Sequence, residues 1–568
     1  MRALLKSQIL KSVWQFGQPE QSFHRSHRLL YSPIFKQYEA VSRGEQPLPE
    51  YFNFAKDVLD KWSQIEKDGK KAFNPALWWI NGRGGEVRWS FEELGIRSRK
   101  VANLLLDQCA LRRGDRILVV LPRIPEWWLL TVACIRTGII LIPGISQLTA
   151  KDMQYRLQAS KAKCIVTTDA LAPAVDSIAN ECPFLQTKLL VSSGEASLTV
   201  HSCAETKLHD PMMIYFTSGT SGAPKMAELS QGSLGFRSIL GKRLWLDLTP
   251  SDIMWSTVDT GWIVAALGTV FGPWVFGSCI FIHNLEQVQS ATILNTLSRF
   301  PITTFLSVPT MYRMLVKDDL TSYKFLSLQH CISGGEPLNP EVAEQWKNKT
   351  GLAIHEVYGQ TEAVGSIYFQ SGMKVKPGSM GKAFPPYDVQ IIDEEGNILP
   401  PGQDGEIAIR VKPKRPLGLF SRYVDNPEKT AATERGEFYV TGDRGVMDQD
   451  RYIRFVGRAD DLMTSSGYRI GPFDIENALL EHPAVAEAAA VSSPDALRGE
   501  VVKAFVVLSP TYTLKNKEDL TVELQEHVKK VTAPYKYPRK MEFVQQLPKT
   551  TTGKIKRNEL RDREWGRI

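Results

Sequence analysis

The chain has 568 residues, of which 43% are hydrophobic, and its formal charge is +7 at pH 7. This length exceeds the size at which one hydrophobic core keeps growing, so two or more domains are expected. No nucleic-acid-binding pattern accompanies the basic residues near the C-terminus, which favours a phosphorylated small ligand over nucleic acid, with a solvated basic face as the alternative. Seven cysteines without a C-x-x-C pair or metal-ligand spacing indicate a reducing compartment.

The N-terminal segment is basic and amphipathic. Arg2, Lys6 and Lys11 precede the first acidic residue, Glu20, and apolar residues recur between them at roughly helical spacing. This pattern is typical of a mitochondrial presequence, which we assign to residues 1–30, and it predicts a location in the mitochondrial matrix. The lysines interrupt the apolar run too often for a secretory signal. An ordinary amphipathic surface helix is the alternative.

Strands and helices alternate after this segment. Residues 116–121, 139–143 and 164–168 are short apolar runs typical of buried strands, while residues 125–137 and 151–160 have helical periodicity. The first of these helices begins at a proline, which suits the first helical position. Alternation of this kind builds parallel sheets with helices on both faces, so the fold class is predicted to be α/β.

A loop rich in glycine and hydroxylated residues follows at residues 217–225, with the sequence TSGTSGAPK. Glycine lets backbone N–H groups converge on an anion, serine and threonine add hydroxyl donors, and lysine supplies a positive charge. The spacing departs from the Walker pattern, because Pro224 precedes the lysine and Met226 follows it. We therefore predict a nucleotide-binding loop of another family, with a Ser/Gly-rich turn as the alternative.

Residues 262–282 contain no charged side chain and are long enough to span a bilayer. Gly268, Gly272, Pro273 and Gly277 interrupt this run, and an apolar strand pattern follows them. A buried helix, a turn and a strand explain the pattern better than a membrane span. No transmembrane segment is expected.

The last third of the chain changes character. From residue 388 onward, short strands alternate with glycine turns, which predicts a distorted β subdomain. Beyond Asp460, helices are expected at 472–482 and 520–531 and strands at 484–492 and 501–508, enough for a small α+β domain. We therefore place a large domain at residues 45–459 and a small C-terminal domain at residues 460–568.

Further motifs follow the glycine-rich loop in a fixed order. They are Gly334-Gly335-Glu336-Pro337, Tyr358-Gly359-Gln360-Thr361-Glu362, Thr441-Gly442-Asp443, Gly457-Arg458-Ala459-Asp460-Asp461 and Pro548-Lys549-Thr550-Thr551-Thr552-Gly553-Lys554. With the loop, they resemble the motifs of the adenylate-forming superfamily of acyl-CoA synthetases and luciferases. Three more segments look like those of the mitochondrial medium-chain acyl-CoA synthetases: residues 259–262, 465–472 and 498–504.

The resemblance implies a large AMP-binding domain, a small mobile C-terminal domain and a ligase reaction. A carboxylic acid, ATP and CoA would give acyl-CoA, AMP and pyrophosphate through an acyl-adenylate, with Mg²⁺ as cofactor, CoA as co-substrate and medium-chain fatty acids as substrates. Activation is needed because a carboxylate is a poor electrophile. The carboxylate must approach the α-phosphate anion against anion, so the site has to neutralise charge. A monomer is expected.

The same resemblance assigns residues to ATP. Lys554 would reach the α-phosphate, Lys225 and Thr361 would share the catalytic role, and Glu362 would hold Mg²⁺, a hard cation that prefers oxygen ligands. Asp443 would bind the ribose. The remaining nucleotide-binding residues are Thr217, Ser218, Gly219, Thr220, Ser221, Gly222, Ala223, Pro224, Gly335, Glu336, Pro337, Glu356, Val357, Tyr358, Gly359, Gln360 and Arg458.

The resemblance also assigns the acid, CoA and a hinge. Trp262, Thr361 and Arg469 would contact the acid, and the small domain would turn at Asp460 between the two half-reactions. A glycine at position 467 would let pantetheine pass the backbone without meeting a β-carbon. The CoA-binding residues would be Gln147, Ser466, Gly467, Tyr468, Arg498, Tyr537, Pro538 and Arg539.

Two positions depart from the family pattern. Leu229 stands where relatives have histidine after the loop lysine, which removes a polar group expected near the site. Arg451 stands where relatives have glycine, in a turn expected to need positive φ. A catalytically weakened pseudoenzyme that only binds nucleotide or acyl-CoA is therefore the alternative function.

Overall fold

The computed structural model describes most of the chain and divides it into two compact units, Met1–Leu48 and Pro49–Ile568. In the first unit only helices α2 (Pro33–Gln37) and α3 (Glu39–Ser42) are described. The predicted presequence at residues 1–30 lies outside the described residues. These are 33–42, 44–71, 74–191, 203–217, 224–240, 246–285, 289–370, 372–384, 386–465, 468–496, 499–510, 512, 516–532, 534–549 and 555–567.

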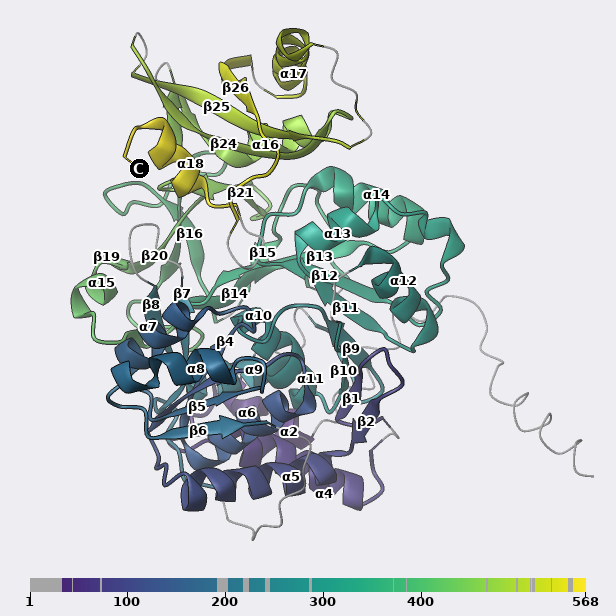
Figure 1. Cartoon of the computed structure of the whole chain (residues 1–568), viewed down its shortest axis with the longest axis vertical. Coiled ribbons are helices and arrows are strands. Elements are labelled where there is room, and N and C mark those ends of the chain that lie inside the picture. The colour runs from purple at the N-terminus through teal and green to yellow at the C-terminus, as the bar shows by residue number, and fades with distance from the viewer. Residues whose placement is uncertain are drawn as a thin grey trace, which may run out of the picture. The chain divides into compact units, whose positions relative to one another are not determined.

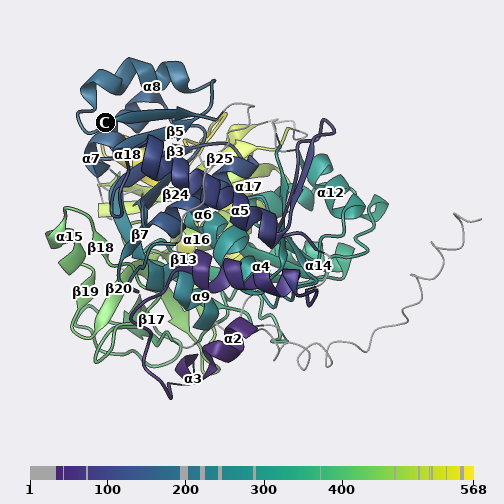
Figure 2. The same cartoon turned by 90° about the horizontal axis from the view of Figure 1, so that it is seen from below.

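A seven-stranded sheet, ordered β18-β8-β7-β4-β3-β5-β6, forms one half of the large domain. Helix α8 lies beside β5 (Figures 1 and 2), and α7 packs against α8 and β3. Helix α6 (Pro125–Thr137) has proline in its first turn and ends at Gly138 with φ 69°. The other bounds are β3 Arg116–Val120, β4 Ile140–Gly144, α7 Ala150–Ser160, β5 Cys164–Thr167, α8 Ala172–Ile178, β6 Thr187–Leu190, β7 Pro211–Thr217, β8 Lys225–Ser230 and β18 Arg422–Tyr423.

A nine-stranded sheet forms the other half, in the order β15-β14-β13-β12-β11-β9-β10-β1-β2. The helices that precede or follow its strands along the chain are α4 Asp60–Lys67, α5 Phe91–Asn103, α9 Arg237–Leu240, α12 Ser290–Arg299, α13 Pro309–Leu315 and α14 Pro340–Thr350. Its strands are β1 Leu77–Ile80, β2 Glu86–Trp89, β9 Ile253–Ser256, β10 Cys279–His283, β11 Thr304–Ser307, β12 His330–Gly334, β13 Ile354–Gln360, β14 Ala363–Tyr368 and β15 Lys382–Ala383.

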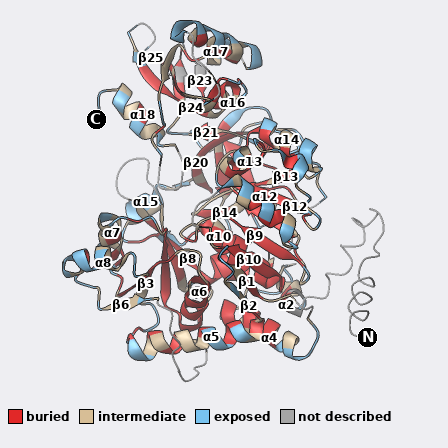
Figure 3. Ribbon diagram, turned by 45° about the vertical axis from the view of Figure 1, so that its right-hand side comes forward, coloured by how far each residue is buried: buried red, intermediate tan, exposed pale blue. Residues whose placement is uncertain are grey.

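Both large sheets are parallel in the middle, and the nine-stranded sheet is antiparallel at both edges, whereas the seven-stranded sheet is antiparallel only at the β8–β18 edge. In the first sheet β8 pairs antiparallel with β7 and β18, and in the second β14 pairs antiparallel with β13. The α/β class, the parallel sheets and the predicted helices and strands are confirmed, and the structure adds antiparallel strands at these edges. Antiparallel neighbours need only a short connection, as between β13 and β14, which are separated by two residues. Figure 3 shows the central strands buried.

The apolar run at residues 262–282 is folded as short helices followed by a strand. Helix α10 (Ile263–Ala266), a π-helical turn (Leu267–Phe271) and helix α11 (Gly272–Val275) precede β10. Almost all of these residues are buried against the two sheets. Within the described part of the chain, no helix combines the length and apolar character needed to cross a bilayer.

The β subdomain is a five-stranded sheet in which β16, β17, β20 and β19 are neighbours and β21 pairs with β20. All its pairings are antiparallel, as the short strands and glycine turns predicted. Helix α15 (Pro427–Ala431) precedes β19. The strands are β16 Val389–Ile392, β17 Asp404–Arg410, β19 Glu434–Arg435, β20 Phe438–Met447 and β21 Ile453–Arg458.

The C-terminal segment has its own sheet and core. Strands β24, β25 and β26 form a three-stranded sheet, and β22 and β23 form a hairpin. Its core consists of residues from this segment alone, including Ile475, Leu479, Val506 and Leu524. The bounds are β22 Met463–Ser465, β23 Tyr468–Ile470, α16 Pro472–Leu480, β24 Val485–Asp495, β25 Gly499–Leu508, α17 Lys517–Val531, β26 Lys540–Phe543 and α18 Arg557–Glu564.

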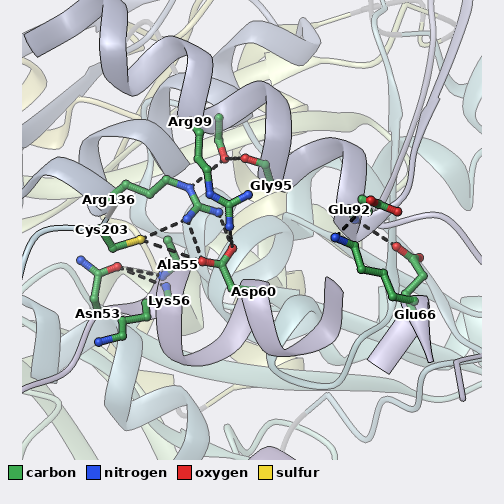
Figure 4. Close-up of polar contacts among 12 residues, drawn as sticks. Asn53, Ala55, Lys56, Asp60, Glu66, Glu92, Gly95, Arg99, Arg136 and Cys203 are labelled. Atoms are coloured by element: carbon green, nitrogen blue, oxygen red, sulfur yellow. Dashed lines mark hydrogen bonds and ion pairs between the residues drawn. The ribbon is translucent and has the colours of Figure 1, made fainter. Parts of the chain in front are cut away.

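A buried ionic network joins helices α4, α5 and α6 (Figure 4). The guanidinium of Arg136 is 2% exposed and donates from Nη2 to Asp60 Oδ1 at 2.7 Å and from Nη1 to Asp60 Oδ2 at 3.0 Å. Arg99 Nη2 lies 2.9 Å from the same carboxylate, and Arg136 Nε donates to Ser98 Oγ at 2.9 Å. Arg136 Nη1 also donates to Cys203 Sγ at 3.1 Å.

Candidate functional site

A cavity of about 920 Å³ lies where both large sheets, the β subdomain and the C-terminal segment meet. Both large sheets contribute ends of strands that also carry the sequence motifs. Such crevices at strand ends are the usual ligand sites of α/β sheets. The predicted site residues that line it are Thr217, Lys225, Trp262, Gly335, Glu336, Pro337, Glu356, Val357, Tyr358, Gly359, Gln360, Thr361, Glu362, Asp443 and Arg458.

Asp443 on β20 lies at the centre of one polar cluster in the cavity. Its Oδ2 accepts hydrogen bonds from the Tyr358 hydroxyl at 2.6 Å and from Gln360 Nε2 at 3.2 Å, while Arg458 Nη1 donates to Oδ1 at 3.0 Å. Pairing of β20 with β21 places Arg458 opposite Asp443. Burial raises the pKa of Asp443, and the Arg458 guanidinium opposes that shift. These three hydrogen bonds fix the Asp443 carboxylate, a hydrogen-bond acceptor, at the wall of the cavity.

Glu362 lies at the centre of a second cluster, at the end of the glycine-rich loop. Its Oε1 accepts from the Tyr423 hydroxyl at 2.7 Å and from Thr217 Oγ1 at 3.3 Å. The ammonium of Lys225 lies 5.1 Å from the centre of the Tyr423 ring. The cavity therefore places one carboxylate and one lysine close to the flanks of the loop, as phosphate and cation binding would require.

Glu356 on β13 is a buried acid in the same wall. The Leu338 amide donates to its Oε1 at 3.4 Å. Burial raises the pKa of Glu356 to about 8, and the bond from Leu338 only partly offsets this effect. Nearby, Thr310 Oγ1 donates to Glu336 Oε2 at 2.7 Å. At neutral pH Glu356 is therefore mostly protonated and can donate a hydrogen bond as well as accept one.

The β13–β14 hairpin brings two backbones unusually close at Gly359. A β-carbon at this position would lie 2.4 Å from the Gly365 nitrogen and 2.9 Å from the Ala363 carbonyl oxygen. The pairing shifts by a bulge between Tyr358 and Gln360, which re-aims the side chains on either side. The Gln360 side chain then bridges the Tyr439 hydroxyl, at 2.7 Å, and Asp443.

The C-terminal segment contributes its own residues to the cavity. Lys549, Ile555 and Arg557 line it, and Lys549 and Ile555 form an isolated β-bridge on either side of the predicted catalytic lysine. Arg557 donates to Glu476 from Nε at 2.8 Å and from Nη2 at 2.5 Å. Glu476 also accepts from the Ala490 amide at 2.9 Å. This bidentate pair fixes the start of α18.

Several predicted site residues lie outside the described residues. They are Ser218, Gly219, Thr220, Ser221, Gly222, Ala223, Ser466, Gly467, Arg498 and Lys554. Only the backbone of Tyr468 and Arg469 is described, in β23. Asp460 lies beside the cavity, with its Oδ1 3.4 Å from Arg458 Nε.

The structure does not bring the described CoA-binding candidates into the cavity. Gln147 is exposed after β4, and Tyr537 to Arg539 lie before β26 in the C-terminal segment. Pro224 is also absent from the lining. The predicted nucleotide-binding residues that line the cavity and the described CoA-binding candidates thus lie in different places in this structure.

Sequence reasoning missed two tyrosine residues that shape the site, Tyr423 and Tyr439. Tyr423 lies on the short strand β18, and Tyr439 lies on β20 only two residues from Thr441. Nothing in the local sequence distinguishes these side chains from ordinary core residues. Their role depends on strand pairing, which the local pattern does not reveal.

The two departures from the family pattern have different outcomes. Position 229 is expected to lie near the site, but Leu229 is fully buried on β8 opposite Met213 and does not line the cavity. Strand alternation turns it to the face opposite Glu228. The predicted positive φ at Arg451 is confirmed, at 66°, in an exposed turn closed by its amide donating to the Asp448 carbonyl at 3.0 Å.

Comparison with known families decides the identity of this fold. Residues 66–423 match the family described as AMP-binding enzyme, and residues 474–554 match the AMP-binding enzyme C-terminal domain. The chain belongs to the AMP-binding enzyme family. The resemblance to adenylate-forming enzymes that the motifs indicated is therefore confirmed, and this AMP-binding enzyme contains both of the family's domains.

Curated relatives of this AMP-binding enzyme cover nearly all of its length. The human protein named acyl-coenzyme A synthetase ACSM4, mitochondrial, is 60% identical over 577 residues, with 100% of both chains covered. The human acyl-coenzyme A synthetase ACSM3, mitochondrial, is 58% identical over 560 residues, with 96% of each chain covered. These names confirm the similarity to mitochondrial acyl-CoA synthetases.

Solved structures show the same fold. The anthranilate CoA ligase AuaEII in complex with anthranoyl-AMP has a TM-score of 0.82 and 27% sequence identity, covering 91% of this chain and 98% of its own. ATP-bound MatB from Rhodopseudomonas palustris has a TM-score of 0.78 and 26% identity, covering 89% of this chain and 99% of its own. Both are similar to this chain across the two family domains.

Proposed function

We propose that this AMP-binding enzyme is a mitochondrial acyl-CoA synthetase that joins medium-chain fatty acids to CoA through an acyl-adenylate. The reaction consumes ATP and releases AMP and pyrophosphate. The observation that carries the proposal is the meeting, in one cavity, of the Asp443 cluster, the Glu362 cluster and the Gly335 to Pro337 turn, which come from three different sheets. The names of the relatives support the reaction.

The two clusters bind different parts of the ATP molecule. Asp443 and Arg458 hold the ribose, with Glu336 and Glu356 to Tyr358 beside the adenine. Lys225 and the loop hold the β- and γ-phosphates, so that pyrophosphate is oriented as the leaving group. Thr361 and Trp262 face the acid. Lys554 neutralises the α-phosphate as the carboxylate approaches it, since two anions must meet there.

The donor set fits a Mg²⁺ ion bound mainly through substrate. Glu362 is one hard oxygen ligand, and Mg²⁺ commonly combines one or two carboxylates with phosphate oxygens and water. In the described part of the chain, no group of three or more His, Cys, Asp or Glu residues could hold a metal by itself. When bound, Mg²⁺ would neutralise charge on the leaving pyrophosphate.

A moving C-terminal domain would serve the second half-reaction. We assign the large domain to residues 45–459 and the lid to residues 460–568, turning at Asp460. The turn would withdraw Lys554 and bring the segment of Gly467 to the acyl-adenylate, together with Arg469 and the CoA-binding residues of the lid. These are Ser466, Tyr468, Arg498, Tyr537, Pro538 and Arg539, and Gln147 is the CoA-binding residue of the large domain. Residues 1–30 would direct the protein to the matrix and then be removed.

Acid-dependent exchange of pyrophosphate into ATP tests the first half-reaction directly. We expect exchange with medium-chain acids and measure it across acids of different length and with benzoate. The alternative function, a pseudoenzyme, predicts that ATP binds but that no acid supports exchange. Neither departure favours this alternative, because Leu229 and Arg451 do not line the cavity.

Replacing Lys554 by alanine separates the two half-reactions. Lys554→Ala should lower the rate of pyrophosphate exchange by a factor of about 100 or more, because it removes a preorganised charge at the α-phosphate. Transfer from supplied acyl-AMP to CoA should persist. Lys556→Ala is the matched control, since Lys556 lies two residues away and its ammonium forms an exposed ion pair with Glu559 at 3.4 Å. Equal loss of both half-reactions in Lys554→Ala would contradict the two-step lid.

A further inference from the structure

Tyr423 lies between the two side chains that the proposed function places at the phosphate end of ATP. Its hydroxyl donates to Glu362 Oε1 at 2.7 Å, and the ammonium of Lys225 lies 5.1 Å from the centre of its ring. The side chain is 6% exposed and lines the cavity. One residue therefore contacts both the carboxylate and the lysine.

The backbone of Tyr423 is fixed from several directions. Strand β18 pairs antiparallel with β8, so Tyr423 lies opposite Ala227, while Arg422 Nε donates to the buried Glu228 at 3.0 Å. The Tyr423 amide donates to Thr430 Oγ1 at 2.9 Å. The Phe420 ring packs edge-on at 4.8 Å between centroids. These contacts hold the ring in one orientation between β8 and Glu362.

Glu362 receives its described side-chain bonds on one oxygen. Among the residues that the structure describes, both Tyr423 and Thr217 donate to Oε1. Oε2 is therefore the oxygen that can bind another ligand. The Glu362 carbonyl accepts from the Phe420 amide at 2.8 Å, which fixes the backbone as well. Burial and the nearby carboxylate raise the pKa of Tyr423, so its hydroxyl remains a donor at neutral pH.

We propose that Tyr423 is a positioning residue for the cation and triphosphate end of ATP. Its hydroxyl orients the Glu362 carboxylate toward a divalent cation, and its ring steadies the ammonium of Lys225. Hydrogen bonds to an ionised carboxylate are stronger than neutral ones, and an aromatic face attracts a lysine ammonium. The inference rests on the proposed function, because it assumes that ATP binds in this cavity.

ATP affinity with and without Mg²⁺ tests this role without relying on turnover. Isothermal titration of the full chain with ATP, in MgCl₂ and in EDTA, gives the gain in affinity that Mg²⁺ provides. Tyr423→Phe keeps the ring and removes the hydroxyl, so we expect this gain to fall about tenfold. Tyr387→Phe is the matched control, because it also removes one buried hydroxyl, which donates to the Val364 carbonyl at 2.8 Å. An undiminished gain in Tyr423→Phe would overturn the proposal.

A double-mutant cycle distinguishes orientation of Glu362 from general loss of structure. If the hydroxyl acts through Glu362, Tyr423→Phe should have no further effect on the Mg²⁺ gain once Glu362→Gln is present. The same loss in both backgrounds would contradict the mechanism. Thermal unfolding of each variant shows whether it is folded. Should Tyr423→Phe not fold, Tyr423→Leu is measured in its place and must also lower the gain.

The ring contact is tested by comparing the two variants. Tyr423→Leu removes the ring as well as the hydroxyl, so we expect a further loss of ATP affinity in EDTA, where no divalent cation helps Lys225 and the loop to neutralise the β- and γ-phosphates. Equal ATP affinity of Tyr423→Leu and Tyr423→Phe in EDTA would contradict the proposal that the Tyr423 ring steadies the Lys225 ammonium. Pyrophosphate exchange is measured separately: a wild-type chain that binds ATP but does not exchange would contradict the proposed function alone.

Discussion

At the scale of single residues, the cavity wall combines ordinary ion pairs with one strongly perturbed acid, Glu356. Its carboxyl lies on β13, buried at 9% exposure, and the Leu338 amide at 3.4 Å is a weak partner for a charged group. Desolvation therefore dominates and raises the pKa to about 8. The nearby Asp443 accepts hydrogen bonds from three donors. Burial raises its pKa too, and the Arg458 guanidinium opposes that shift.

Glu356 makes the stability of the protein depend on pH. A raised pKa means that the folded state retains a proton that the unfolded state loses above about pH 4.5, so the stabilising effect is complete below that pH. It is lost progressively as pH rises through about 8. Glu356→Gln should flatten this fall in the free energy of unfolding between pH 5 and 8, measured by urea denaturation at several pH values. Parallel pH profiles for wild type and variant would show that Glu356 ionises normally.

At the scale of elements, helices α4, α5 and α6 are held together by charge as well as by apolar packing. Arg136 is almost completely buried in α6, and Asp60 of α4 neutralises it, with Arg99 of α5 as a second partner. Figure 4 shows both arginines directed toward this carboxylate. A buried ion pair adds little stability over an apolar pair, but breaking one side of it is costly.

Removing the Asp60 carboxylate should therefore destabilise the large domain strongly. Asp60→Ala leaves Arg136 buried without its counter-charge, and we expect a loss of about 3–5 kcal/mol in the free energy of unfolding. Lys67→Ala is the control on the same helix, because its pair with Glu92 at 3.2 Å is exposed and should cost less than about 1 kcal/mol. Similar denaturation midpoints for the two variants would contradict a structural role for the network.

At the scale of the whole molecule, the C-terminal segment carries a core of its own. The apolar cluster of α16, α17, β24 and β25 contains no residue from the large domain. Polar contacts to the large domain include the bond from Asn339 Nδ2 to Asn477 Oδ1 at 3.1 Å. Apolar contact is made as well, between the Phe455 and Phe473 rings. Separate cores are typical of domains that move relative to each other.

Residues 460–568 should fold when produced alone. Because their core is self-contained, we expect a cooperative thermal transition and native-like far-UV circular dichroism, with no binding of ATP, since Asp443, Glu362 and Lys225 are missing. A non-cooperative transition would show that this core needs the large domain. The same segment without its last helix, α18, serves as the control, because Leu560 of α18 belongs to a smaller second cluster.

Much of the fold follows from local pattern. The helix at Pro125–Thr137 is predicted to the residue, because a proline start and a glycine end mark both boundaries. The strands around it differ by a residue or two from expectation. The antiparallel edge strands β8 and β14 were not foreseen, since strand direction depends on pairing with partners far along the chain.

The sequence alone determined the family, the order of the motifs and the class of ligand, because runs such as residues 217–225 and 358–362 carry their chemistry in consecutive residues. Tertiary structure alone decided how these motifs cooperate. In the folded chain Leu229 is buried in the core, burial raises the pKa of Glu356, and Tyr423 contacts Glu362 and Lys225. These outcomes depend on strand pairing and desolvation, which join residues that are far apart in sequence and therefore leave no local pattern.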